Sequence, residues 1–471
     1  MRKQILFIEP VLKPQQSKRK KKKQGKGKLA PLQIRDDAAG IDISPTEMFA
    51  AVGPDKDDQP VRRFGPFTED LNRLADWLIK CKVKTVAMES TGVYWVALFQ
   101  ILEDRKLEVY LVNAHHLKSV PGRKSDVSDC QWIQQLHSLG LLKASFRPPQ
   151  QVCALRSILR HRSNLTRAAS EQIQLMQKAL DQMNVLIHHV LSDITGTTGL
   201  LMLDAIIAGN RDPQELAKFR DRRVKASPET IIKALEGDYR EEHIFTLRQS
   251  LELYRFIEKQ MEECDQEIGQ RLKEFDSKLE GVGVAEPDSA PSGPISKSQQ
   301  KKQDRQALSQ QHHRILGVDL TQIDGISTGT IQVLLSEVGP DLSRFRNAGA
   351  MACWVGLCPN REVSGGKVLR SNTQKKKCRL ALALRLAANS LLRSQSALGD
   401  CFRRLRTKLG TPKAITAMAH KLLRILYHLI TTQEPFDETI LQEQQKQHQQ
   451  RRLKNMERQA RSLGFQLLPI Q

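Results

Sequence analysis

The sequence predicts an α/β domain followed by a long, mostly helical remainder, and three observations lead to this fold class. Short apolar segments near the N-terminus form a hairpin and then alternate with helical segments, which is typical of a mixed sheet with helices on its faces. From residue 148 onward, apolar residues recur at helical spacing instead. A chain of 471 residues is also too long for one ordinary core, so we expect two or three domains.

The first domain is expected at residues 35–147. Its strands are predicted where short apolar or β-branched segments end in turn residues. Its helices are predicted where apolar residues share one helical face, as Leu71, Leu74 and Leu78 do. The predicted strands are 40–44, 48–52, 61–64, 84–88 and 107–112, and the predicted helices are 68–80 and 93–103.

The middle of the chain, residues 148–276, is predicted to be a helical domain. Spaced apolar residues in 148–182 and 243–275 favour two long antiparallel helices that form a coiled coil. Residues 277–312 are rich in Gly, Ser, Pro, Lys and Gln, a composition typical of a flexible linker.

The C-terminal domain, residues 313–435, is predicted to be mostly helical. Residues 320–338 suggest a helix-hairpin-helix-like segment with a turn at Gly325, and such turns present backbone N–H groups to phosphates. A plain helix-pair turn is the alternative. A later helix at 380–392 is expected to bury Leu382, Leu386 and Leu391.

The charge balance indicates a polyanionic partner. The chain has 74 Lys and Arg against 52 Asp and Glu, a formal net charge of +22, and each phosphate neutralised by such a surface releases a condensed counterion. Part of the surplus lies at the ends: 1–34 is predicted to be a disordered basic arm and 436–471 a polar basic tail. Aromatic residues make up only 5%, which argues against a platform for stacking bases.

The cysteines and the apolar segments bear on location. Eight cysteines occur singly, with no Cys-x-x-Cys and no Cys/His spacing typical of zinc, so neither a disulfide framework nor a structural zinc is predicted. No segment approaches the length of a membrane span. We therefore expect a protein of the cytoplasm that makes no membrane contact.

Four carboxylates occur where metal chemistry would need them. Asp42 interrupts an apolar strand, and Glu89 ends another. Asp126 and Asp129 begin a predicted helix and project from one face of it. Taken singly, the helix pair would be ordinary first-turn acids, and Asp42 a turn residue. Together they predict a site for Mg²⁺, in which two ions about 4 Å apart activate the attacking oxygen and stabilise the leaving oxygen.

A serine lies in a glycine turn of the C-terminal domain. Ser364 precedes Gly365 and Gly366, and on residues alone most such serines have no chemical role. Its basic neighbours Lys367 and Arg370 are suited to a phosphate backbone, and the glycines allow that backbone to approach closely. The other predicted nucleic-acid contacts are Lys124, Lys375, Lys376, Lys377 and Arg379.

The motifs around these residues resemble those of the DEDD-type transposases of bacterial insertion sequences, which are RNA-guided (bridge-RNA) serine recombinases. The resemblance covers roughly 37–145 and 314–435. It is carried by Gly-Ile-Asp-Ile-Ser at 40–44, Met-Glu-Ser-Thr-Gly-Val-Tyr at 88–94, Val-Asn-Ala at 112–114 and Lys-Ser-Asp-Val-Ser-Asp at 124–129.

The resemblance implies a fold, a reaction and partners. It implies an RNase-H-like (RuvC-like) N-terminal domain in which Asp42, Glu89, Asp126 and Asp129 hold the metal. Ser364 matches the serine that attacks DNA and becomes covalently joined to it, with Ser371 as the rival position. The resemblance also implies donor and target double-stranded DNA, a structured guide RNA encoded by the element, and a homo-oligomer, a dimer or tetramer.

Two other functions fit the same residues. A metal-dependent nuclease or junction resolvase would use the quartet with water and leave Ser364 idle. A non-catalytic nucleic-acid-binding protein, such as a domesticated transposase, would need neither. The preferred hypothesis is a DNA transposase that uses both the quartet and the serine.

Overall fold

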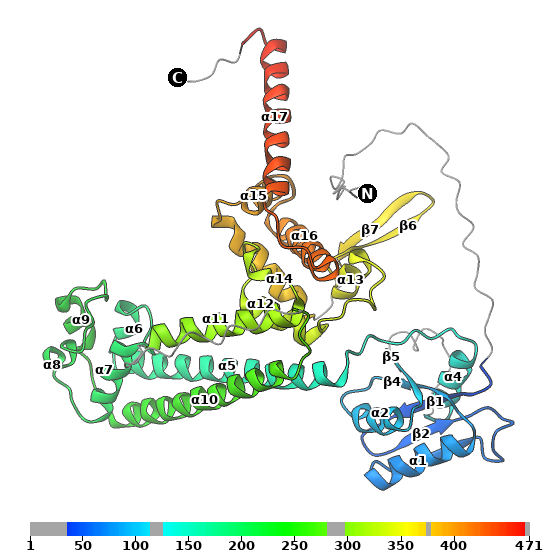
Figure 1. Ribbon diagram of the computed structural model, residues 1–471. Helices are drawn as coiled ribbons and strands as arrows, with labels where there is room; N and C mark the ends of the chain where they lie inside the picture. Colours follow the sequence, from blue (N-terminus) through cyan, green and yellow to red (C-terminus); the bar gives the residue numbers. More distant parts are fainter. Residues whose placement is uncertain (1–34, 114–125, 280–296, 374–377, 467–471) are drawn as a thin grey trace. The chain divides into compact units, whose positions relative to one another are not determined.

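The computed structural model describes residues 35–113, 126–279, 297–373 and 378–466, which belong to two units divided after Arg147 (Figure 1). The basic arm predicted at 1–34 lies outside the described residues. In the described part of the chain, no helix combines the length and apolar character needed to cross a membrane.

The first unit contains a mixed five-stranded sheet of order β3-β2-β1-β4-β5. The pairs β1/β2 and β2/β3 are antiparallel, whereas β1/β4 and β4/β5 are parallel. The predicted mixed sheet is therefore confirmed, and it is consistent with an RNase-H-like domain. The strands are β1 (Ala38–Ile43), β2 (Met48–Ala51), β3 (Val61–Phe64), β4 (Thr85–Glu89) and β5 (Glu108–Val112).

Helices cover both faces of this sheet. On one face, α1 (Thr68–Lys80) and α2 (Trp95–Asp104) bury their leucines against alternate residues of β1 and β4, such as Ile41 and Met88. On the other face lies α4 (Asp126–Ser138), whose Ile133 packs on Ala87 and Val112. Since successive strand residues face opposite sides, the residues next to Ile41 and Met88 face α4.

Two contacts hold α4 against the sheet. Gly40 of β1 meets its backbone so closely that an added Cβ would lie 2.2 Å from the nitrogen of Gln134 and 2.4 Å from the oxygen of Cys130. At the other end, the buried ring of His137 shares a hydrogen bond of 2.8 Å between its Nε2 and Oγ1 of Thr85. Burial lowers the pKa of His137 to about 4, so the neutral ring makes this contact at neutral pH.

The second unit begins with two long helices, α5 (Gln150–Gln182) and α10 (Glu241–Lys273). Arg162 donates to Asp265 at 2.7 Å, and Thr166 one turn later contacts Met261 one turn earlier, so the helices run antiparallel. This agrees with the antiparallel arrangement expected from the sequence. Four short helices connect them: α6 (Ile187–Val190), α7 (Thr197–Ile207), α8 (Pro213–Ala217) and α9 (Pro228–Leu235). They share one apolar core with α5 and α10.

The flexible linker expected at 277–312 is wrong for its second part, and the polar basic tail expected at 436–471 contains a helix. Within 277–312, the helix α11 (Lys297–Leu316) begins at Lys297; residues 280–296 lie outside the described part. Within 436–471, α17 spans Thr439–Ser462. Both helices lack an apolar stripe but are rich in Gln, Lys and Arg, which have good helix propensity. The end of α11 is fixed because Arg314 donates to the carbonyl oxygens of Leu272 and Phe275 at 2.8 and 2.6 Å.

The rest of the second unit packs helices around Phe402, Met418 and Leu422, which are fully buried. The turn predicted at Gly325 occurs between the short 3-10 helix Leu320–Gln322 and α12. The remaining elements are α12 (Thr328–Glu337), α13 (Ala348–Val355), β6 (Pro359–Ser364), β7 (Lys367–Thr373), α14 (Arg379–Ser390), the 3-10 helix Leu391–Arg393, α15 (Ala397–Leu409) and α16 (Thr411–Thr432).

The predicted buried face of α14 is wrong in part. Leu382 and Leu386 are 58% and 64% exposed, whereas Leu380 and Leu384, on a neighbouring stripe, are fully buried. This stripe packs against α12 and α16. Several leucine stripes on one helix are equally apolar in sequence, and only the neighbouring helices select one of them.

Candidate active site

Asp42 and Glu89 lie side by side at the carboxyl ends of two parallel strands. Ile41 of β1 is paired with Met88 of β4, so the next residues, Asp42 and Glu89, continue the same register. Because Ile41 and Met88 face α1 and α2, both carboxylates belong to the face that α4 covers. Both side chains are half-buried. The sheet therefore presents two acids to one helix.

The helix α4 adds Asp129 to this edge. Its neighbour Cys130 is fully buried, and its pKa is raised to about 12 by burial, with the charges of Asp42 and Asp129 acting in the same direction. Gly40, two residues before Asp42, lies so close to Cys130, the residue after Asp129, that an added Cβ would be 2.4 Å from the Cys130 backbone oxygen. The structure thus brings Asp42 and Asp129 to the same region.

The fourth acid, Asp126, is the first residue of α4. Its position three residues before Asp129 places both on one face of the helix. Its side chain lies outside the described part, and so does Lys124. The predicted quartet is thus described for Asp42, Glu89 and Asp129 and, at Asp126, for the backbone alone.

The carboxylate oxygens in this region are ligands that suit Mg²⁺. Among described side chains, the group of three whose ligand atoms all lie within 4.8 Å of one another is elsewhere, in the second unit. Mg²⁺ requires oxygen ligands, keeps several waters and takes one or two carboxylates together with substrate phosphates. Carboxylates spaced around a helix start are compatible with that mode.

Thr91 contacts Glu89, one of the candidate acids, although the sequence alone did not single it out. Its hydroxyl donates to Oε1 of Glu89 at 2.9 Å. The backbone N–H of Ser90 donates to the carbonyl of Val112 at 2.9 Å, and Gly92 follows with φ +56°. These contacts turn the chain sharply after β4 and orient the carboxylate. The signal was present in the Glu-Ser-Thr-Gly run, where a hydroxyl two residues from an acid favours a local hydrogen bond.

The strands β6 and β7 form a hairpin (Figure 1), and Ser364 is the last residue of β6. Gly365 and Gly366 form the turn with φ of +55° and +79°, values that suit a two-residue hairpin turn and favour glycine. Ser364 is paired with Lys367, the first residue of β7. All of these residues are exposed to solvent.

A β-bulge determines which residues share a face with Ser364. Val363 is paired with Val368, but Glu362 is paired with Arg370, so one extra residue of β7 interrupts the alternation. Positions 364 and 362 of β6 lie on one face, and paired positions share a face. Lys367 and Arg370 therefore lie on the face of Ser364. Ser371 is paired with position 361 and lies on the opposite face.

The remaining predicted contacts are only partly described. Arg379 begins α14 and is half-buried. Lys375, Lys376 and Lys377 lie outside the described residues. The acids belong to the first unit and Ser364 to the second.

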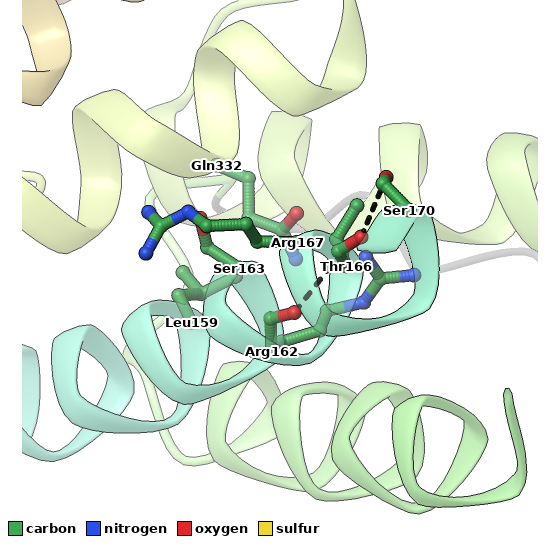
Figure 2. A pocket seen from close by; sticks show the side chains of 7 residues that line it. All are labelled: Leu159, Arg162, Ser163, Thr166, Arg167, Ser170 and Gln332. Carbon is green, nitrogen blue, oxygen red and sulfur yellow. Dashed lines mark hydrogen bonds between the residues drawn. The ribbon is translucent and has the colours of Figure 1, made fainter. Parts of the chain in front are cut away.

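A shallow pocket of about 400 Å³ lies between α5 and α12 in the second unit (Figure 2). Its lining is basic and hydroxyl-rich, but it contains neither Ser364 nor any of the four acids. Arg162 is also held by Asp265 of α10. The lining residues are Leu159, Arg162, Ser163, Thr166, Arg167, Ser170 and Gln332. The predicted reaction residues therefore lie outside this pocket.

Two family models match the chain. Residues 39–185 match a transposase model for the DEDD transposases of IS110 type, and residues 319–401 match a model described as transposase, IS116/IS110/IS902 family. The first match contains Asp42, Glu89, Asp126 and Asp129, and the second contains Ser364. No curated protein matches the chain.

Proposed function

We propose that this chain, whose matched regions support a DNA transposase of IS110 type, is an Mg²⁺-dependent serine recombinase that moves an insertion sequence. Transposase domains cut and rejoin DNA, so the family matches support an enzyme that cleaves and joins DNA strands. The proposal adds the residues: Asp42, Glu89, Asp126 and Asp129 for the metal, and Ser364 for the attack. The observation that carries the serine step is the hairpin face that Ser364 shares with Lys367 and Arg370.

The hairpin is suited to nucleophilic attack on a phosphodiester. The Oγ of Ser364 forms a bond to phosphorus, and the bond from that phosphorus to one deoxyribose oxygen breaks, so that this oxygen leaves and takes a proton. Lys367 and Arg370 stabilise the negative charge that develops on the phosphate. The hydroxyl of another strand then attacks the same phosphorus and releases Ser364. One phosphodiester is exchanged for another, so no nucleotide is consumed.

The serine needs a group that accepts its proton, and no histidine adjoins Ser364 in the sequence. We propose that one of the acidic residues accepts this proton, either from the same subunit or from another subunit of the homo-oligomer. Bound Mg²⁺ would supply the positive charge that offsets these carboxylates and polarises the scissile phosphate. The hydrogen bond from Thr91 would keep the carboxylate of Glu89 oriented within this acidic site.

A structured RNA encoded by the element is the proposed source of sequence selection. The formal charge of +22 suits a large polyanionic partner in addition to the DNA. When base pairing identifies the target, the protein has to recognise backbone and shape only. Phosphate contacts from Lys367 and Arg370 are of this sequence-independent kind.

The test is a recombination assay in cells, with donor and target plasmids and the flanking DNA supplied. We expect Ser364→Ala and Asp126→Ala each to abolish recombination, and the covalent protein–DNA adduct of the wild type to vanish with Ser364→Ala. Ser371→Ala is the matched control and should retain both. Full activity of Ser364→Ala together with a dead Asp126→Ala would identify a metal nuclease and refute the serine step. Activity in both variants would refute the catalytic proposal altogether.

A further inference from the structure

The turn after α5 brings three metal-ligating side chains together. Asp181 lies in the last turn of α5, and His188 and His189 lie in α6. One ligand atom from each lies within 4.8 Å of the others. The Oδ1 of Asp181 is 3.1 Å from Nε2 of His188 and 3.9 Å from Nε2 of His189. Ligands about 2.0–2.1 Å from a tetrahedral ion are separated by distances of this order.

We propose that Asp181, His188 and His189 bind a divalent transition metal ion, with Zn²⁺ as the best-suited ion, distinct from the proposed Mg²⁺ site. Two imidazoles and one carboxylate are the ligand types that Zn²⁺ takes, whereas Mg²⁺ prefers oxygen ligands alone. Three protein ligands leave one tetrahedral position for water. Water can reach that position because Asp181 and His189 have side chains that are 53% and 62% exposed.

The two imidazole rings lie next to each other and to the carboxylate. The ring centroids of His188 and His189 are 4.3 Å apart, and Asp181 contacts both Nε2 atoms. An imidazole binds a metal ion through a nitrogen lone pair, and the carboxylate of Asp181 would neutralise part of the charge of that ion.

Local packing already positions the ligands. His188 has a side chain that is 11% exposed, and within the described residues its Nδ1 is buried without a hydrogen-bond partner, so Asp181 is the polar contact of this ring that the structure records. Between the ligands, Asn184 has φ +55°, and the N–H of Leu186 donates to the carbonyl of Ala234 at 2.7 Å. A bound ion would therefore join the end of α5 to the short helices that follow it. Its expected role is to stabilise this junction.

Binding is tested on the full chain, purified with a chelator and then titrated with Co²⁺, whose tetrahedral complexes absorb visibly, followed by displacement with Zn²⁺. We compare the wild type with His189→Gln, which removes an exposed ligand, and with His161→Gln, an exposed histidine of α5 outside the cluster. The variant Asp42→Asn, which removes one proposed Mg²⁺ ligand, distinguishes metal binding at this site from binding at the proposed Mg²⁺ site. Far-UV circular dichroism checks that each variant is folded.

The wild type, His161→Gln and Asp42→Asn should show the tetrahedral Co²⁺ spectrum. His189→Gln should lose at least roughly 10- to 100-fold in affinity, the loss that weaker outer-sphere changes already cause. Zn²⁺ should raise the Tm of the wild type and leave that of His189→Gln unchanged. Equal Co²⁺ spectra, affinities and Zn²⁺-dependent Tm values in the wild type and His189→Gln would overturn the proposal, as would no binding by the wild type. None of these outcomes depends on transposition.

Discussion

The backbone of Gly40 in β1 lies directly against the backbone of Gln134 in α4, so close that a Cβ on Gly40 would be 2.2 Å from the Gln134 nitrogen. Cβ contacts this short do not occur in folded proteins, and the obstacle is backbone, which cannot rotate away. The strand that carries Asp42 and the helix that carries Asp126 and Asp129 therefore meet only because residue 40 is glycine.

We predict that Gly40→Ala pushes α4 away from the sheet. The free energy of unfolding should fall by about 1–3 kcal/mol, as in other overpacked cores, and recombination should fall although all four acids remain. Urea denaturation measures the first effect. Gly269→Ala is the control, because in α10 the added Cβ has nothing within 4 Å and should leave stability equal or higher. Equal effects of the two substitutions would refute the close-contact explanation.

Thr91 should matter through Glu89. Removing its hydroxyl with Thr91→Val deletes the 2.9 Å hydrogen bond and leaves the carboxylate free to rotate. We expect recombination to fall by about 10- to 100-fold, as for other residues that orient metal ligands. The apparent affinity for Mg²⁺, taken from the metal dependence of DNA cleavage, should weaken in parallel. Thr91→Ser keeps the hydroxyl and should restore both, whereas a fully active Thr91→Val would show that Glu89 needs no such support.

The buried His137 predicts a pH dependence of stability. Its folded pKa of about 4 lies below the ordinary value of 6.5, so the unfolded chain binds a proton that the folded chain excludes. The free energy of unfolding should therefore fall as pH drops from about 6.5 toward 4, by up to about 3 kcal/mol. We expect His137→Gln to remove this part of the slope, measured as urea midpoints of variant and wild type. Parallel curves would exclude His137 as the titrating group.

The face of the β6–β7 hairpin predicts which basic residues act with Ser364. Lys367→Ala and Arg370→Ala should each lower recombination by about 10²-fold, because each removes charge that stabilises the attacked phosphate. The exposed hairpin position should keep the Tm unchanged. Covalent adduct formation on a single cleaved strand measures this step separately from assembly. Val368→Ala, on the opposite face, is the control; a loss as large as that of Lys367→Ala would mean that the hairpin acts as a whole.

Local patterns were sufficient for much of the first unit. The spacing of Leu71, Leu74 and Leu78 predicted the helix found at Thr68–Lys80, and the strand before Glu89 was found at Thr85–Glu89. Here the sequence is informative because an element that is buried on one face repeats its apolar residues at its own period. Asp42 and Glu89 are candidate site residues for a related reason, since each is a charge in an otherwise apolar strand.

The remaining features needed the tertiary structure. The helices Lys297–Leu316 and Thr439–Ser462 have no apolar stripe, so the sequence shows no helical periodicity there. The exposed Leu382 and the buried Leu384 differ only in which neighbours they meet. Likewise, the faces of the hairpin on which Ser364 and Ser371 lie depend on the strand pairing and its bulge.

By itself, the sequence determined the order of the elements in the first unit, the candidate acids and the basic character of the chain, because these follow from residue type and short-range spacing. Only the tertiary structure decided which face of each element is used. In the structure, Asp42 lies beside Glu89, α4 packs over this face of the sheet, and Asp181 lies close to His188 and His189. The physical reason is that such contacts join backbone segments whose register and packing no local pattern encodes.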